Sequence, residues 1–131
     1  MRIFKSSPAG FALACAWLLL IDARPPVASA AENPLRGKIL FLRCASCHDA
    51  STSASAKIGP NLHGLVGRPV ASLAGYRYSA ALKSQTFVWD AVHLDAWLTN
   101  PNAVAPGTTM AFAGIPEEAD RQAIISYLAT Q

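Results

Sequence analysis

The hydrophobic residues of this chain fall into stretches with helical spacing, separated by long polar and irregular segments. Leu35, Ile39 and Leu42 recur on what would be one helix face, behind an Asn33-Pro34 pair typical of helix starts. We therefore expect a helix here, with this stripe buried.

A second helix is predicted over residues 90–100, with an aspartate at its start and a proline beyond its end. Its apolar stripe consists of Ala91, Leu94 and Leu98, with Trp97 beside it. His93 lies off this stripe, so we interpret it as a solvated surface residue.

The last predicted helix begins at Pro116-Glu117-Glu118, where acidic residues suit the positive end of a helix. It continues through Ile124, Tyr127 and Leu128. We expect the first and last helices to cross and to bury each other's apolar stripes.

The N-terminal thirty residues have a different pattern. Arg2 and Lys5 precede an unbroken apolar run over residues 11–21, and residues 28–30 (ASA) form a small-residue cleavage site. This pattern predicts a secretory signal peptide over residues 1–30 and a single exported, periplasmic domain over residues 31–131. The run is shorter than the roughly 20 residues of a membrane-spanning helix, so an uncleaved membrane anchor is the alternative.

Removal of this leader changes the charge of the protein. The chain has 11 basic and 8 acidic residues, and the leader holds three of the former and one of the latter, which leaves a net charge near +1. Nucleic-acid binding needs a concentrated basic patch, so this class of partner is excluded.

The chain has three cysteines, and Cys15 lies in the leader. Cys44 and Cys47 remain, in a C-x-x-C-H motif that ends at His48. Two thiols one helical turn apart can bond the two vinyl groups of one haem, and the histidine that follows can bind its iron. A disulfide or a thioredoxin-like pair is the alternative, but the surrounding patterns are helical. A zinc site would need about four nitrogen or sulfur ligands, and the chain has no second cysteine pair to supply them.

Two long segments, residues 49–79 and 100–115, are irregular and rich in Gly, Pro, Ser and Ala. Irregular loops of this length normally argue against a compact domain. A buried haem removes the conflict, because it is a large apolar group that such loops can surround.

A low-spin haem iron in an electron carrier needs a second axial ligand. Met1 lies in the leader, so Met110 is the one thioether left in the exported chain. It sits in a Pro/Gly/Thr loop that gives it no place on a helical core stripe. His63 and His93 are the competing ligands, and we interpret both as surface residues.

Five segments, in this order, resemble the small soluble cytochrome c family over nearly all of the exported chain. They are residues 44–48 (CASCH), 59–68 (GPNLHGLVGR), 75–79 (GYRYS), Trp89 and residues 106–115 (PGTTMAFAGI). The resemblance implies an all-α cytochrome c fold, with short helices and long loops around one covalently bound haem c.

The resemblance also implies roles for individual residues. Pro60 would accept a hydrogen bond from the ring nitrogen of His48 that does not bind iron, which fixes the imidazole. A haem propionate would be bound by Arg68, Tyr78 and Trp89. The cofactor-binding residues we expect are thus Cys44, Cys47, His48, Pro60, Arg68, Tyr78, Trp89, Trp97, Met110 and Phe112, with His48 and Met110 as iron ligands.

The chain departs from the family pattern around the haem. Trp97 stands where the family has a tyrosine that bonds the methionine sulfur, and Leu82 stands where it has an asparagine, so we expect an altered hydrogen-bond network. The cations near the haem edge are few, namely Arg43, Lys57 and Lys83, so strong electrostatic steering is not expected.

In the first helix, Arg36 and Leu40 take the places of the family's glycine and aromatic residue. Gly37 and Phe41 follow one place later. We therefore expect the contact of this helix with Tyr127 to be adjusted.

The resemblance implies a monomeric, non-enzymatic one-electron carrier in the periplasm, without stable membrane insertion. Its partners would be redox proteins: a membrane oxidase, a reductase or a dehydrogenase. The alternative is a dedicated electron-accepting subunit of a periplasmic dehydrogenase. A haem enzyme or ligand sensor would need an open iron position, against which Met110 argues.

Overall fold

The computed structural model describes residues 33–53 and 57–131. This part of the chain is helical, and its one β feature is an isolated bridge between Pro69 and Val88. The helices are α1 (Pro34–Phe41), α2 (Ala80–Lys83), α3 (Ala91–Thr99), α4 (Pro101–Val104) and α5 (Glu118–Leu128). The expectation of an all-α fold of short helices and long loops is confirmed. The predicted signal peptide lies outside the described residues.

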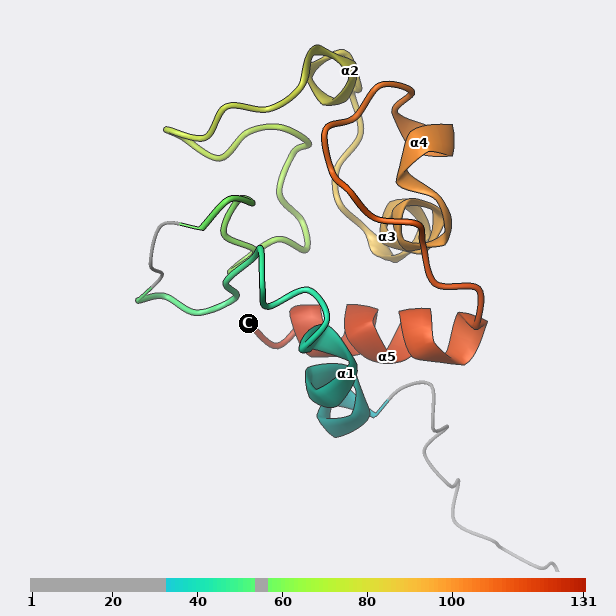
Figure 1. The fold of residues 1–131 in the computed structure, drawn as a ribbon. Coiled ribbons are helices and arrows are strands. Elements are labelled where there is room, and N and C mark those ends of the chain that lie inside the picture. Colours follow the sequence, from blue (N-terminus) through green and yellow to red (C-terminus); the bar gives the residue numbers. More distant parts are fainter. Residues whose placement is uncertain (1–32, 54–56) are drawn as a thin grey trace, which may run out of the picture.

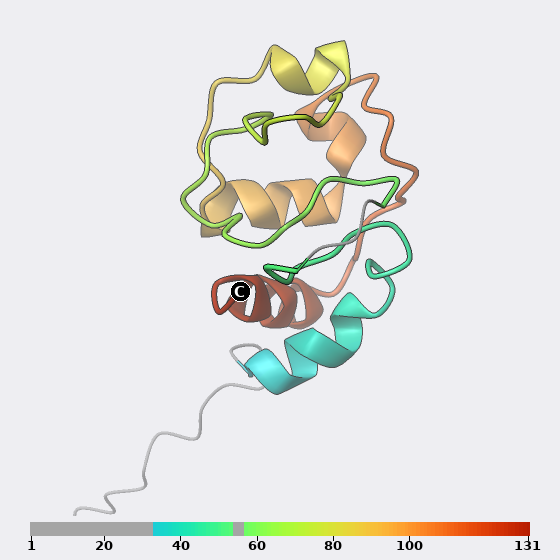
Figure 2. The same cartoon turned by 90° about the vertical axis from the view of Figure 1, so that its left-hand side faces the viewer.

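The helices form two groups joined by loops. Figures 1 and 2 show α1 crossing beneath α5 at one end of the molecule, with α2, α3 and α4 at the other. Residues 42–79 and 105–117 connect the two ends without a helix in their described parts. None of the helices in residues 33–53 and 57–131 has the length and apolar character needed to span a bilayer.

Two of the predicted helix starts are confirmed by side-chain caps, whereas α5 begins at Glu118 without one. The Asn33 side chain accepts a hydrogen bond from the Leu35 amide at 3.0 Å, and Pro34 occupies the first turn. The Asp90 carboxylate accepts from the His93 amide at 2.8 Å and so begins α3. These side chains bind backbone N–H groups that have no partner within the helix.

The first helix is present, but the prediction of its buried face is wrong. Leu35, Ile39 and Leu42 are 71%, 67% and 70% exposed, whereas Gly37 and Phe41 are buried. Apolar spacing alone does not distinguish the two faces of α1, because both carry apolar residues. Closeness of approach decides between them, and only the face with Gly37 allows close backbone contact.

The expectation that α1 crosses α5 is confirmed, and Gly37 is the point of closest approach. A Cβ atom built on Gly37 would lie 1.9 Å from the Ala123 carbonyl oxygen, so no side chain fits there. One turn on, the rings of Phe41 and Tyr127 lie 5.3 Å apart. The contact with Tyr127 is thus made by Gly37 and Phe41, one place later than the family register.

The face that α3 buries is close to the predicted one. Leu94, Trp97 and Leu98 are buried, but Ala91 is exposed in the first turn. Ala91 precedes the part of α3 that contacts the core, so its inclusion in the predicted buried stripe was wrong.

One buried cation connects α5 to the other end of the molecule. The guanidinium of Arg121 donates to Asp95 of α3 at 2.8 Å and to the carbonyl oxygens of Ile115 and Pro116 at 3.0 and 2.7 Å. The hydrogen bonds that Arg121 donates to the Asp95 carboxylate raise the pKa of Arg121, so the cation stays charged. The end of the loop 105–117 is therefore held between α3 and α5.

The corrected face of α1 can be tested by comparing two alanine variants. Gly37→Ala should lower the free energy of unfolding of the holoprotein by about 1–3 kcal/mol or more, because the added methyl group overlaps Ala123. Leu35→Ala, on the exposed face, should change it by no more than about 0.5 kcal/mol. Denaturant unfolding measures both. A larger loss from Leu35→Ala would contradict the assigned face.

Candidate functional site

The two cysteines lie on a tight turn that directly follows α1. The His48 amide donates to the Cys44 carbonyl at 2.9 Å, and the Cys44 amide donates to Phe41 at 2.8 Å. Both thiols are free, Cys44 half-buried and Cys47 exposed. Burial raises the pKa of the Cys44 thiol. The turn thus presents two unpaired thiols about one helical turn apart.

The His48 imidazole is buried with one of its nitrogens engaged. Its Nδ1 lies 2.8 Å from the Pro60 carbonyl oxygen, the bond that the family resemblance implies. Since a carbonyl can only accept, Nδ1 carries the proton and Nε2 has the free lone pair. Burial, the largest effect, lowers the pKa of His48. A neutral imidazole with a free Nε2 is what a metal ligand requires.

Two residues outside the expected set of cofactor-binding residues hold this histidine turn. The Lys57 ammonium donates to the carbonyl oxygens of Ala45 and His48 at 2.5 and 2.9 Å. A Cβ atom on Gly59 would lie 2.5 Å from Cε1 of the His48 ring. Gly59 belongs to the GPNLHGLVGR segment, but the sequence alone does not show which of its glycines lies against the His48 ring.

Two of the three residues expected at the propionates, Arg68 and Trp89, come from paired segments. The Trp89 amide donates to the Arg68 carbonyl at 3.0 Å, and the Gly67 amide donates to the Trp89 carbonyl at 2.9 Å. The Arg68 guanidinium donates to the carbonyl oxygens of Asn61 and His63 at 2.9 and 3.3 Å. Arg68 and Trp89 are therefore brought together by backbone pairing.

The loop that carries Met110 follows α4 and a buried alanine. Ala105 has no exposed surface, and Gly107 turns the chain with a φ of 88° that favours glycine. Past Met110, Gly114 has a φ of 98°, and a Cβ there would lie 2.0 Å from the Thr99 carbonyl oxygen. This close approach of loop to helix places Met110 against the core.

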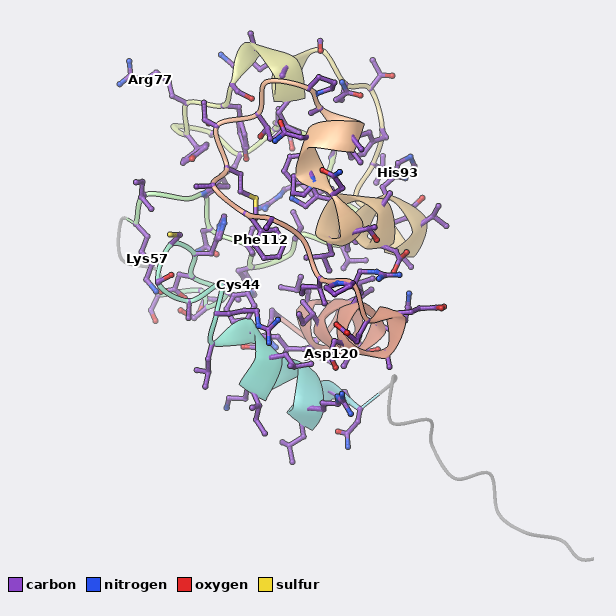
Figure 3. All side chains as sticks on the ribbon, turned by 45° about the vertical axis from the view of Figure 1, so that its right-hand side comes forward. Cys44, Lys57, Arg77, His93, Phe112 and Asp120 are labelled. Carbon is purple, nitrogen blue, oxygen red and sulfur yellow. The ribbon has the colours of Figure 1, made fainter. Side chains whose placement is uncertain are left out.

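All ten residues expected to bind the cofactor line one cavity of about 260 Å³. They come from the turn after α1, both long loops, the segment between α2 and α3, and α3. In the view of Figure 3, Cys44 and Phe112 lie near the middle of the molecule, between Lys57 and His93. Leu82 is a wall of the same cavity, and Trp97 packs edge-on to Trp89 at 5.4 Å.

Several donor and ligand groups of this cavity have no partner within the described protein, and their chemistry fits a haem with propionates and a ligated iron. No fully enclosed side-chain nitrogen or oxygen in the described residues lacks a hydrogen-bond partner. The indole N–H groups of Trp89 and Trp97 bond no described residue, and both side chains line the cavity. Together with two thiols, one imidazole nitrogen and the Met110 thioether, they match the chemistry of a covalently held haem.

The two competing histidines lie outside the cavity lining. His63 is exposed, as expected. His93 is only half-exposed, since its Nδ1 lies 2.8 Å from Asp90 and its ring stacks on Phe87 at 4.5 Å. The expectation of a solvated His93 is corrected to this extent. It lies across the molecule from Lys57 (Figure 3).

Comparison with known proteins agrees with this geometry. Residues 35–131 match the family described as Cytochrome c. The chain belongs to this family. It is 40% identical over 104 residues to cytochrome c2 of Rhodomicrobium vannielii, covering 79% of this chain and 83% of the relative. It is 39% identical over 98 residues to cytochrome c2 of Rhodoblastus acidophilus (75% and 92%) and 41% identical over 101 residues to cytochrome c of Nigella damascena (77% and 91%).

Membership in the family establishes the cofactor and the class of function. Cytochromes c are electron carriers rather than enzymes, and their haem c is attached covalently through the C-x-x-C-H motif. This cytochrome has one such motif, Cys44 to His48, and so carries one haem c.

Gly59 provides a test of how closely the loop must pass the ring. Gly59→Ala should displace the His48 imidazole and lower the free energy of unfolding by about 1–3 kcal/mol, with a changed haem absorption spectrum. Gly64→Asn is the matched control, because nothing lies within 4 Å of Gly64 and asparagine tolerates its φ of 63°. An unchanged spectrum and stability in Gly59→Ala would refute the close contact.

Proposed function

We propose that this cytochrome is a mobile one-electron carrier in the periplasm, with His48 and Met110 as the axial ligands of its haem iron. The observation that supports the ligand pair is that one cavity is lined by both the free Nε2 side of His48 and the single thioether of the exported chain. With the same two ligands in both oxidation states, electron transfer needs little rearrangement of the protein.

The residues around the cavity suit the proposed cofactor roles. Trp89 offers an unpaired indole N–H, and Arg68 contributes a guanidinium at the same wall. A partly buried carboxylate is costly unless it is hydrogen-bonded, so these donors suit a haem propionate. Tyr78 is half-buried there, and burial raises the pKa of its hydroxyl, which keeps it a donor at neutral pH.

The partners we propose are redox proteins that bind briefly at the open side of the cavity. The Lys57 ammonium and the Arg68 guanidinium are each held by hydrogen bonds to two backbone carbonyls, so neither is free to reach toward a partner. Few free cations therefore remain for steering. We expect association rates that depend only weakly on salt, as for a partner without a strongly acidic docking surface.

The axial ligands are tested by substituting the three candidates in turn. Met110→Ala should abolish the weak sulfur-to-iron band at the red end of the oxidised spectrum. It should also lower the reduction potential by on the order of 100 mV, within the ~0.8 V range that axial ligands span, because a thioether favours Fe(II). His63→Ala and His93→Ala are the controls and should leave both unchanged. The opposite pattern would show a bis-histidine haem.

Export and processing are tested on the protein from the periplasmic fraction. We expect its N-terminal sequence to begin at Ala31, because Ala28 and Ala30 provide the small residues that precede a cleavage site. Material that begins at Met1 and remains with the membrane pellet would establish the uncleaved anchor instead.

A further inference from the structure

Lys57 is the one charged side chain of the described residues that bonds the haem-attachment turn, residues 44–48. Its ammonium donates to the Ala45 carbonyl oxygen at 2.5 Å and to the His48 carbonyl oxygen at 2.9 Å. Neither of these carbonyls accepts a hydrogen bond from a backbone amide in residues 33–53 and 57–131. Lys57 therefore satisfies two carbonyls of the turn that the backbone leaves open.

The segment that begins with Lys57 holds the turn at further points. The Gly59 amide donates to the Cys47 carbonyl at 2.8 Å, and the Pro60 carbonyl oxygen lies 2.8 Å from Nδ1 of His48. Figure 3 shows Lys57 at the outer edge of the molecule, next to the chain that follows α1. Because the uncharged contacts of Gly59 and Pro60 remain when Lys57 is replaced, we expect the turn to keep its place in a Lys57 variant.

The positive charge of Lys57 is not neutralised by a carboxylate. The ion pairs of the described residues do not include Lys57. Asp49 is the one acidic residue in residues 33–89, and its carboxylate accepts from the amide and the hydroxyl of Ser51 at 2.9 and 2.8 Å. The carbonyl partners of Lys57 carry only partial charges, so they orient the ammonium without cancelling its charge. A cation is thus fixed beside the backbone of His48.

We propose that Lys57 is a positioning residue that raises the reduction potential of the haem, by fixing a positive charge on the turn that carries the iron ligand His48. Reduction lowers the positive charge of the iron by one unit, so a neighbouring cation favours Fe(II) over Fe(III). The two carbonyl bonds keep this cation at one place in both oxidation states. The proposal rests on the proposed function only in taking His48 as an iron ligand.

The alternative role for an exposed lysine is a docking charge for a partner protein. To bind a partner's carboxylate, the Lys57 ammonium would have to leave the carbonyls of Ala45 and His48, and these two bonds would be lost. Lys38 on α1 has the same charge, but it is in no ion pair of the described residues and does not line the cavity. Lys38 is therefore the matched control for a charge that is not bound to the turn.

The experiment measures the redox equilibrium of the exported holoprotein with ferrocenemethanol, which gives one electron to Fe(III) and becomes its ferrocenium cation. At about 0.01 M salt the Debye length is ~30 Å, so the charge of Lys57 is weakly screened. Lys57→Gln should lower the equilibrium constant for haem reduction by roughly threefold, the size expected for loss of one partly solvated charge. Lys57→Arg keeps the charge and the donors and should restore the parent value. Lys38→Gln should change the constant by less than about 1.5-fold.

Added salt separates the effect of the charge from a displacement of the turn. At about 1 M salt the Debye length is ~3 Å, and the difference between the parent and Lys57→Gln should largely disappear, because Lys57 is exposed. A difference that high salt leaves unchanged would overturn the proposal.

Three other results would also overturn it. They are equal effects of Lys57→Gln and Lys38→Gln, failure of Lys57→Arg to restore the parent value, and an altered haem spectrum in Lys57→Gln, which would show a change of ligands. The axial ligand pair is decided separately by the spectra of the Met110 and histidine variants, in which Lys57 is unchanged. A bis-histidine haem would therefore refute that pair without changing the comparison of the Lys57 variants.

Discussion

The close crossing of α1 and α5 is the contact on which the haem site depends. At Gly37 the two backbones approach so closely that a Cβ atom would overlap the Ala123 carbonyl. The cysteine turn begins directly after α1, with the amides of Cys44 and Ala45 bonded to the Phe41 carbonyl. The position of the thiols and of His48 is thus determined by the helix packing rather than by the motif itself.

Beyond this crossing, the cavity is enclosed largely by loops, and polar side chains rather than regular structure hold these loops in place. Lys57, Asn61 and Arg68 bond backbone carbonyls of the first loop, and Arg121 bonds two at the end of the second. Each such bond satisfies a carbonyl that a helix or strand would otherwise satisfy. This arrangement leaves the apolar side chains of the loops free to face the cofactor.

The rim of the haem cavity and the outer face of α1 differ in composition. The open side of the haem cavity has few free cations, so recognition of a redox partner there rests on fit more than on long-range attraction. The outer face of α1 combines apolar residues with cations, and it adjoins the haem-attachment turn.

Much of the site could be predicted from the sequence, because its chemistry resides in motifs of adjacent residues. The C-x-x-C-H motif, the single thioether of Met110 and the capping residues Asn33 and Asp90 act through local spacing, and the structure places the ten expected site residues around one cavity. The proposed ligand roles of His48 and Met110 remain predictions of that chemistry.

Only the tertiary structure decided which face of α1 is buried and which residues support His48. Leu35, Ile39 and Leu42 have the spacing of a core stripe, but α5 packs against Gly37 because absence of a side chain permits backbone contact there. Likewise, Lys57 and Gly59 contact atoms of Ala45 and His48 because the loop between them folds back on the turn. The spacing of apolar residues shows that a helix face is apolar. Whether that face is buried depends on the shape of the packing partner, here α5, which lies more than 80 residues away in the chain.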